Sequence, residues 1–271
     1  MDKVDGVILD WAGTTVDFGC FAPVEAFLQI FQETGVAATV AEARKPMGML
    51  KRDHIRAMLE MERLQEAWRQ VKGRASTAED VERLYERFEP LLMASLEQYA
   101  QPLPGVVESV NLLRQSGIRI GSTTGYTDLM MDVVAEEAEK QGYAPDFRIT
   151  PDATQSYGRP YPYMIFRNME ALRLHAVWTT VKVGDTIADI REGVHAGVWS
   201  VGVMAGSSQL GLSCERYQGL QEKEKNAAFA AVAQEFKAAG ADFVISTLGE
   251  LPTLIEHINE KIAQGARPYG T

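Results

Sequence analysis

The stretch that decides the fold is Val4-Asp5-Gly6-Val7-Ile8-Leu9-Asp10-Trp11-Ala12-Gly13-Thr14-Thr15. Its short apolar run predicts a buried strand over residues 4–10, followed by a sharp turn that Gly13 permits. Ligands of parallel sheets bind at the carboxyl ends of the strands, so Asp10 stands where such a sheet places functional side chains. The alternative interpretation of Asp10, taken alone, is a helix or turn cap.

Similar apolar runs recur along the chain and predict further strands at 118–122, 147–150, 181–184, 199–203 and 243–246. Helical spacing of apolar residues separates most of them, at 105–115, 129–141, 160–172, 188–195 and 248–263. Several of these helices are followed by a glycine stop, at Gly117, Gly142 or Gly197. The alternation predicts an α/β fold, a Rossmann-like doubly wound parallel sheet covered by helices on both faces.

One segment breaks this alternation. Between Asp17 and Tyr99 the pattern is helical throughout, with amphipathic stretches at 21–33 and 80–99. Capping-box patterns occur at Thr39-x-x-Glu42 and Ser76-x-x-Glu79. We therefore expect residues 18–100 to form an inserted all-helical cap domain, and residues 1–17 with 101–271 to form the core. Such a cap can close over the edge of the sheet.

Composition narrows the classes of partner and compartment. The chain has 271 residues, 46% of them hydrophobic, and 27 basic against 37 acidic residues give a net charge of -10. An acidic surface disfavours nucleic acid and anionic membranes, but a local pocket can still bind a small anion. Cys20 and Cys214 make no disulfide framework, and neither a signal-peptide pattern nor a membrane-spanning apolar run is found. We expect a reduced, cytoplasmic protein.

A pair of carboxylates, Asp185 and Asp189, follows the apolar run at 181–184. If a helix begins between them, their spacing brings them close together near its first turn. Two carboxylates there repel each other unless they gain from the helix dipole or a bound cation. Alone, the pair is better explained as helix capping. Together with Asp10 at the end of another strand, a Mg²⁺ site is the better explanation.

Hydroxyl groups and a glycine follow the run at 118–122, in the order Ser122-Thr123-Thr124-Gly125-Tyr126. Backbone N–H groups at a helix start, with a threonine hydroxyl, can cradle a phosphate, although serine and threonine also serve as ordinary helix caps. Arg159, between Gly158 and Pro160, offers a guanidinium fork that can bind two phosphoryl oxygens. Its alternative role is a surface arginine before a helix.

In this order the motifs resemble the haloacid dehalogenase superfamily. Its members carry a nucleophilic Asp after the first strand, a Ser or Thr after the next, then a basic residue, and paired acidic residues after a further strand. The resemblance covers the whole chain, including the helical insertion. Phosphatases of the superfamily usually read Asp-x-Asp, but the second position here is Ala12. Alanine cannot transfer a proton, although its carbonyl oxygen can coordinate Mg²⁺.

The predicted cap contains a lysine with reactive potential. Lys51 follows the Met-rich stretch Met47-Gly48-Met49-Leu50, and His54 lies one helical turn later. Most lysines are solvated, and a histidine here can equally make a surface or interhelix contact. If closure of the cap buries Lys51, its pKa falls and the neutral amine can attack a carbonyl group.

The wider set of motifs resembles phosphonoacetaldehyde hydrolases, also called phosphonatases. It consists of DWAGTTVD at 10–17, GCFAP at 19–23, ARKPMGMLK at 43–51, GSTTGY at 121–126 and GRPYP at 158–162. The resemblance implies that Asp10 is the nucleophile, that Lys51 forms a Schiff base, and that Mg²⁺ is the cofactor. Its implied ligands are Asp10, the Ala12 carbonyl and Asp185, with Asp189 in support. The other implied site residues are Thr124, Gly125, Tyr126, Arg159, Met47, Cys20 and His54.

The implied reaction cleaves the carbon-phosphorus bond of phosphonoacetaldehyde to acetaldehyde and phosphate, within the degradation of 2-aminoethylphosphonate. An imine on Lys51 would accept the bonding electrons as Asp10 attacks phosphorus, which explains the loss of an acid at Ala12. The family also implies a homodimer, which the helix with Phe27, Ile30 and Phe31 could form unless those residues face the interior. The rivals are a phosphate-ester phosphatase or phosphomutase of the same superfamily, and a receiver-like module phosphorylated on Asp10. The carboxylates at Asp185 and Asp189 disfavour a metal-free dehalogenase.

Overall fold

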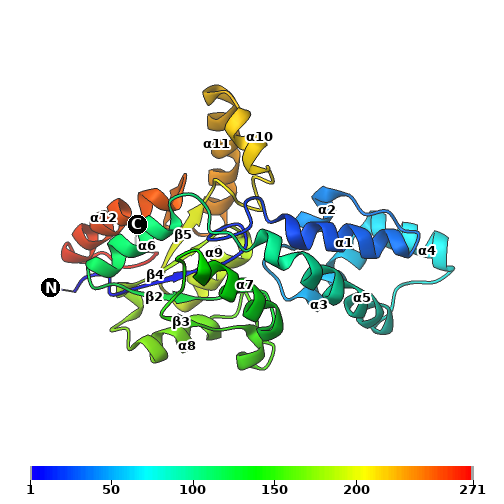
Figure 1. Ribbon diagram of the computed structural model, residues 1–271, viewed down its shortest axis with the longest axis horizontal. Coiled ribbons are helices and arrows are strands. Elements are labelled where there is room, and N and C mark those ends of the chain that lie inside the picture. The colour runs from blue at the N-terminus through cyan, green and yellow to red at the C-terminus, as the bar shows by residue number, and fades with distance from the viewer. Residues whose placement is uncertain (1, 270–271) are drawn as a thin grey trace.

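A six-stranded parallel sheet runs through the larger part of the molecule (Figure 1), in a computed structural model that describes residues 2–269. The strands are β1 (Gly6–Leu9), β2 (Arg119–Ser122), β3 (Phe147–Arg148), β4 (Thr180–Gly184), β5 (Trp199–Val203) and β6 (Phe243–Ile245). Their order is β3-β2-β1-β4-β5-β6, and every neighbouring pair is parallel. The predicted α/β sheet is confirmed. Because β1 lies between β2 and β4, the three motif-bearing strand ends are adjacent.

Helices cover both faces of this sheet. α6 (Val106–Gln115), α7 (Asp128–Lys140) and α12 (Leu251–Ala263) contribute to the core on one face, and α8 (Tyr163–Leu172), α9 (Ile187–Ala196) and α11 (Glu222–Ala238) to that on the other. Side chains of β1 pack on both faces of the sheet, because successive residues of a strand point to opposite faces. Val7 and Leu9 join the first core, whereas Ile8 packs in a separate cluster with Ile165.

Some predicted boundaries need correction. The predicted helix at 160–172 begins only at Tyr163, and that at 248–263 divides into a short 3₁₀ turn, Leu248–Glu250, and α12. Between β5 and β6 the structure has α10 (Cys214–Gly219) and α11 (Glu222–Ala238), for which no bounds were predicted from the sequence. This pair projects away from the sheet (Figure 1). The glycine stops are confirmed, because Gly117, Gly142 and Gly197 all have positive φ.

The chain between β1 and α6 is helical. It contains α1 (Phe21–Glu33), α2 (Val40–Arg44), α3 (Lys51–Leu59), α4 (Glu62–Lys72) and α5 (Ala78–Leu96), followed by a 3₁₀ turn, Glu97–Tyr99. We call residues 21–99 the helical segment; it lies beyond one end of the sheet (Figure 1).

The two predicted capping boxes have different outcomes. The box of Thr39 and Glu42 is confirmed at the start of α2. The box of Ser76 and Glu79 was wrong by one residue, because Thr77 and Asp80 form it instead. Both pairs have the required spacing, but the Asp80 carboxylate also forms an ion pair with Arg74, at 2.5 Å. This additional interaction favours the register that buries Asp80.

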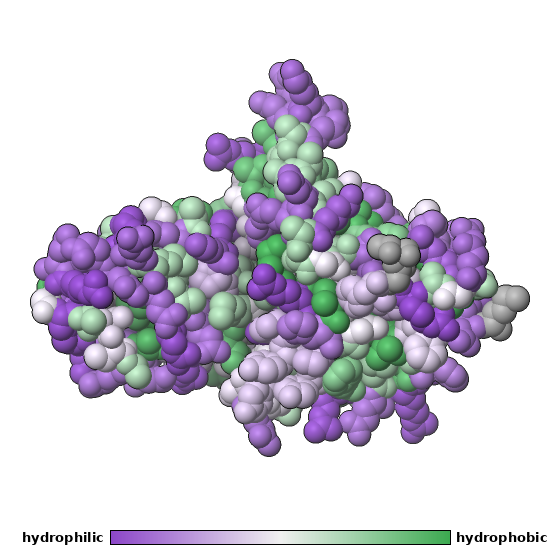
Figure 2. Space-filling view, turned by 180° about the vertical axis from the view of Figure 1, so that it is seen from behind, coloured by the Kyte–Doolittle hydropathy of each residue, from purple (hydrophilic) through white to green (hydrophobic). Residues whose placement is uncertain are grey.

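The apolar face of α1 is internal. Phe27, Ile30 and Phe31 are at most 1% exposed, and Phe27 stacks on Phe88 with ring centroids 4.4 Å apart. These three residues therefore cannot form a dimer interface without unfolding their own core. The outer surface of the helical segment is mostly hydrophilic in the view of Figure 2. Within residues 2–269, no helix combines the length and the apolar character needed to cross a membrane.

Candidate active site

Three buried carboxylates meet at the carboxyl end of the sheet. Asp10 follows β1, Asp185 follows β4, and Asp189 lies in the first turn of α9. One oxygen from each lies within 4.8 Å of the others. Gly13 makes this approach possible, because it has a φ of +88° and a Cβ there would stand 2.2 Å from Asp185 Oδ2. The sequence-based expectation that these carboxylates converge agrees with this geometry.

Asp185 is the carboxylate that most needs a cation. Its Oδ2 accepts a hydrogen bond from the Ser208 N–H at 2.7 Å, but no lysine or arginine in residues 2–269 forms an ion pair with it. Burial raises the pKa of Asp185 well above its ordinary value, and the charges of Asp10 and Asp189 raise it further. Oxygen donors with an excess of negative charge fit Mg²⁺ well. The fit is to a divalent cation held by Asp10 and Asp185.

Asp189 differs because donors of the protein already surround it. Its Oδ1 lies 2.8 Å from Lys182 Nζ and 3.1 Å from Arg159 Nη1. Its Oδ2 accepts the Thr186 hydroxyl at 2.6 Å. Burial would raise the pKa of Asp189, but Arg159 and Lys182 outweigh it and lower the pKa below its ordinary value. These contacts suit the supporting role expected of Asp189 rather than direct coordination.

Arg159 points into the same site and is 5% exposed. Its Nη2 lies 2.5 Å from Asp10 Oδ1, and its Nε lies 3.0 Å from Glu192 Oε2. Three carboxylates, those of Asp10, Asp189 and Glu192, pair with this buried guanidinium, so the alternative of an exposed surface arginine is excluded. The guanidinium is placed beside the carboxylate that the resemblance identifies as the nucleophile.

Lys51, the first residue of α3, reaches this site from the helical segment. Its side chain is buried, and Nζ lies 4.7 Å from the centre of the Tyr126 ring. Burial, together with the charge of Arg159, lowers the pKa of Lys51 to about 8, against the raising effects of Cys20 and Asp10. Gly48 brings its loop close to α9, because a Cβ there would stand 2.5 Å from Thr186 Oγ1. A side chain at position 48 would force the lysine loop away from the sheet.

A cavity of about 20 Å³ collects most of the predicted site residues. Its lining is Asp10, Ala12, Cys20, Met47, Gly48, Lys51, Thr124, Gly125, Tyr126, Arg159, Asp185 and Thr186. Of the residues named from the sequence, only His54 and Asp189 lie outside this lining. The phosphate-cradle residues Thr124 and Gly125 precede the helix rather than begin it, since Thr127 caps α7.

His54 lies behind Lys51, away from the cavity lining. Its ring stacks on Phe27, with centroids 3.8 Å apart, and its Nε2 donates to the Ala43 carbonyl at 2.8 Å. Burial, together with Lys51, holds the pKa of His54 well below its ordinary value, so the ring is neutral. Nδ1 is buried without a partner among the described residues and is therefore the free basic nitrogen. Proton transfer by His54 stays a prediction.

Two buried charged residues were missed in the sequence. Lys182 lies in β4 at 1% exposure, and Glu192 lies on α9 at 0%. The signal was available, since a lysine within an apolar strand at the sheet centre needs a buried partner. Glu192 is that partner of Lys182: it follows Asp189 by three residues and so lies on the same side of the helix.

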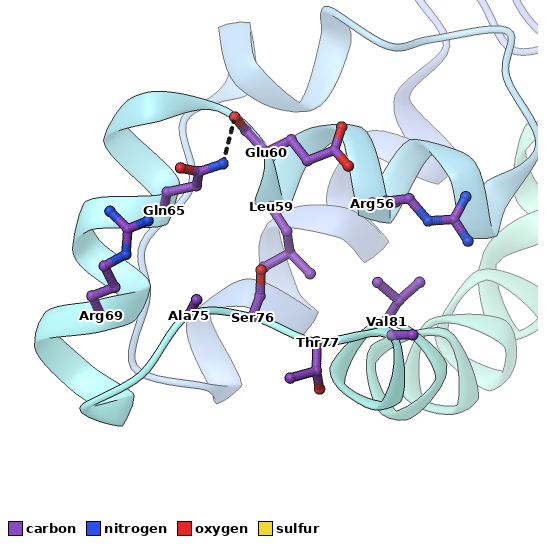
Figure 3. A pocket seen from close by; sticks show the side chains of 10 residues that line it. Arg56, Leu59, Glu60, Gln65, Arg69, Ala75, Ser76, Thr77 and Val81 are labelled. Atoms are coloured by element: carbon purple, nitrogen blue, oxygen red, sulfur yellow. Dashed lines mark hydrogen bonds between the residues drawn. The ribbon is translucent and has the colours of Figure 1, made fainter.

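A larger cavity of about 280 Å³ lies within the helical segment, between α3, α4 and the start of α5 (Figure 3). Arg56, Gln65 and Ser76 are among its lining residues, and Gln65 donates to the Glu60 carbonyl at 3.1 Å. None of the residues singled out from the sequence for chemistry lines it. Size alone therefore does not locate the active site.

Comparisons with known proteins agree with this geometry. The profile of the haloacid dehalogenase-like hydrolases matches residues 4–197. A phosphonoacetaldehyde hydrolase from Lysinibacillus sphaericus (strain C3-41) is 54% identical over 261 residues, which cover 96% of this chain and 97% of that protein. The chain belongs to the phosphonoacetaldehyde hydrolase family of haloacid dehalogenase-like hydrolases. It is therefore a hydrolase, and the resemblance drawn from its motifs is confirmed.

Two further relatives of the same family match nearly the whole chain. A bifunctional phosphonoacetaldehyde hydrolase/aminoethylphosphonate transaminase from Clostridioides difficile (strain 630) is 50% identical over 96% of this chain, which matches 41% of that longer protein. The crystal structure of a phosphonoacetaldehyde hydrolase-like protein from Oleispira antarctica superimposes with a TM-score of 0.94 at 40% identity, covering 98% of this chain and 96% of that one. The fold is thus shared over nearly the full length of the chain.

Proposed function

We propose that this protein hydrolyses phosphonoacetaldehyde to acetaldehyde and phosphate, through an imine on Lys51 and a phosphorylated Asp10. The observation that carries the proposal is the cavity in which a buried lysine of lowered pKa faces Asp10, with Ala12 in place of an acid. A phosphatase needs that acid and has no use for the lysine. The high identity to named phosphonoacetaldehyde hydrolases supports the same substrate.

Lys51 and Asp10 provide the two groups that bond covalently to the substrate, and water completes the reaction. The Lys51 amine adds to the aldehyde and expels water to form a protonated imine. Asp10 then attacks phosphorus, and the electron pair of the carbon-phosphorus bond moves into the imine to give an enamine. Protonation on carbon and hydrolysis release acetaldehyde and restore Lys51. Water then cleaves the aspartyl phosphate, which releases phosphate and restores Asp10.

Arg159 and a metal ion would balance the charge of these steps. The Arg159 guanidinium, already beside Asp10, can donate to phosphoryl oxygens as the attack proceeds. We propose Mg²⁺ as the cofactor, held by Asp10, Asp185 and the Ala12 carbonyl, with Asp189 in support. When bound, Mg²⁺ neutralises phosphoryl oxygens and the attacking carboxylate.

Borohydride trapping tests the proposal directly. The protein is incubated with phosphonoacetaldehyde and Mg²⁺, reduced, and mapped by mass spectrometry, while free phosphate is assayed in a parallel sample. We expect a reduced adduct on Lys51 and phosphate release that a chelator abolishes. Phosphate release from sugar phosphates with no lysine adduct would instead identify a phosphatase or phosphomutase.

The pH dependence of imine formation should follow Lys51. A folded-state pKa of about 8 means that the amine is protonated below that pH and nucleophilic above it. We therefore expect the rate of adduct formation to rise from pH 6 to about pH 8 and then level off, whereas an unperturbed lysine would still be gaining reactivity near pH 10. Rapid-quench borohydride trapping at a series of pH values measures this. A rate that keeps rising to pH 10 would contradict the lowered pKa.

Three broader expectations join this proposal. We propose that residues 18–100 act as a cap domain on a core of residues 1–17 and 101–271, and that the protein works in the cytoplasm in 2-aminoethylphosphonate degradation. We also propose a homodimer, formed through surfaces other than the buried face of α1. Light scattering coupled to size-exclusion chromatography measures the oligomeric state.

A further inference from the structure

Lys182 and Glu192 form a buried ion pair that the proposed reaction does not use. Lys182 Nζ lies 3.3 Å from Glu192 Oε2 and donates to Thr123 Oγ1 at 2.8 Å. Glu192 Oε2 also accepts the Thr123 hydroxyl at 3.0 Å. A buried ion pair often stabilises a fold less than apolar residues of the same size would, so its presence calls for another explanation.

The pair surrounds Arg159. Glu192 Oε2 holds Arg159 Nε at 3.0 Å, and Thr123 Oγ1 accepts from Arg159 Nη2 at 2.9 Å. Nη1 is held by Asp189, which Lys182 in turn contacts at 2.8 Å. All three nitrogens of the Arg159 guanidinium thus have partners, and these contacts direct Nη2 toward Asp10 Oδ1.

We propose that Lys182 and Glu192 are positioning residues that aim Arg159 at the phosphoryl group and balance the charge around it. Lys182 shares Asp189 and Glu192 with Arg159, so neither carboxylate depends on the guanidinium alone. Without Lys182, both carboxylates would draw Arg159 away from Asp10. Without Glu192, two cations would face each other beside Asp189. The inference rests on the proposed function, because it assigns Arg159 to phosphoryl transfer.

Three variants separate positioning from simple packing. We expect Lys182→Met to lower kcat for phosphate release about 100-fold, the loss that a misplacement of about 1 Å can cause. Glu192→Gln should have a smaller effect, since its amide oxygen can still accept from Arg159. The combined variant, Lys182→Met with Glu192→Gln, loses one charge of each sign. Its kcat should be about tenfold higher than that of Lys182→Met alone, because the two sites are coupled. A role in packing alone predicts that the combined variant is the worst of the three.

Two further readouts complete the experiment. The borohydride adduct on Lys51 should persist in all three variants, because none of the replaced groups contacts the lysine, and the affinity for inorganic phosphate with Mg²⁺ should fall about tenfold in Lys182→Met. Thr180→Val, two residues before Lys182 on β4, is the matched control. It removes the part-buried hydrogen bond that the Thr180 hydroxyl donates to the Ala176 carbonyl, and it should leave kcat unchanged.

The outcomes are decisive in both directions. Unchanged kcat and phosphate affinity in Lys182→Met, or a parallel loss of adduct, activity and thermal stability in all variants, would overturn the inference. If the wild-type protein forms no adduct, the imine proposal fails separately, and phosphate affinity still decides the role of Lys182 and Glu192.

Discussion

Replacing Lys51 with arginine is expected to slow phosphate release from phosphonoacetaldehyde by about 10⁴-fold, within the range that loss of a covalent catalytic group causes. Arginine keeps the positive charge and much of the bulk near Tyr126, but it stays protonated and cannot form an imine. Without the imine, the carbon-phosphorus bond has no acceptor for its electrons. A stopped-flow phosphate assay measures the effect.

Lys45→Arg is the matched control for this variant. Lys45 lies in the same loop but is exposed and outside the small cavity, so its replacement should leave the rate unchanged. Borohydride should trap wild type and the Lys45 variant, and fail with the Lys51 variant. Near-normal turnover by Lys51→Arg would show that bond cleavage needs no imine.

Replacing Asp10 with asparagine is expected to abolish phosphate release, by on the order of 10⁵-fold or more, as loss of a nucleophile does in other covalent enzymes. The amide is nearly the same size, but it is a far weaker nucleophile and a poorer ligand for Mg²⁺. The variant should fold normally, because one of three crowded carboxylates loses its charge. Lys51 should still form its imine, so the borohydride adduct should accumulate without phosphate.

Asp5→Asn provides the comparison. Asp5 lies just before the amino end of β1, the end opposite to Asp10, and its carboxylate accepts the His175 N–H at 2.8 Å. It should retain full activity. If Asp10→Asn released phosphate at a tenth of the wild-type rate or more, another group would have to be the nucleophile.

The sequence allowed the adjacency of Asp10 and Asp185 to be predicted, because both follow apolar runs and parallel strands end at a common edge. Lys182 within an apolar strand signals the need for a buried partner, but the sequence does not identify Glu192 as that partner, because pairing between β4 and α9 depends on how the helix packs on the sheet. The capping-box error at Ser76 has a similar origin, because the choice of Thr77 depends on Arg74. The bounds of α11 were not predicted, because its alanine-rich sequence presents few large apolar residues at helical spacing.

The enclosure of the lysine likewise depends on how the helical segment meets the sheet. No spacing within either part predicts that Gly48 would rest on Thr186, or that a Gly125 Cβ would stand 3.0 Å from the Met49 carbonyl. Such contacts join residues from separate elements, and their closeness is decided by packing.

The small volume of the active-site cavity bears on the turnover rate of the enzyme. A space of about 20 Å³ has room for roughly one water molecule and none for an aldehyde bearing a phosphonate. The cavity is therefore too small for the substrate, and we expect Lys51 and its loop to move away from the sheet when substrate enters and when phosphate leaves. We expect the frequency of these movements to set an upper limit on the turnover rate, however fast the bond-breaking step becomes.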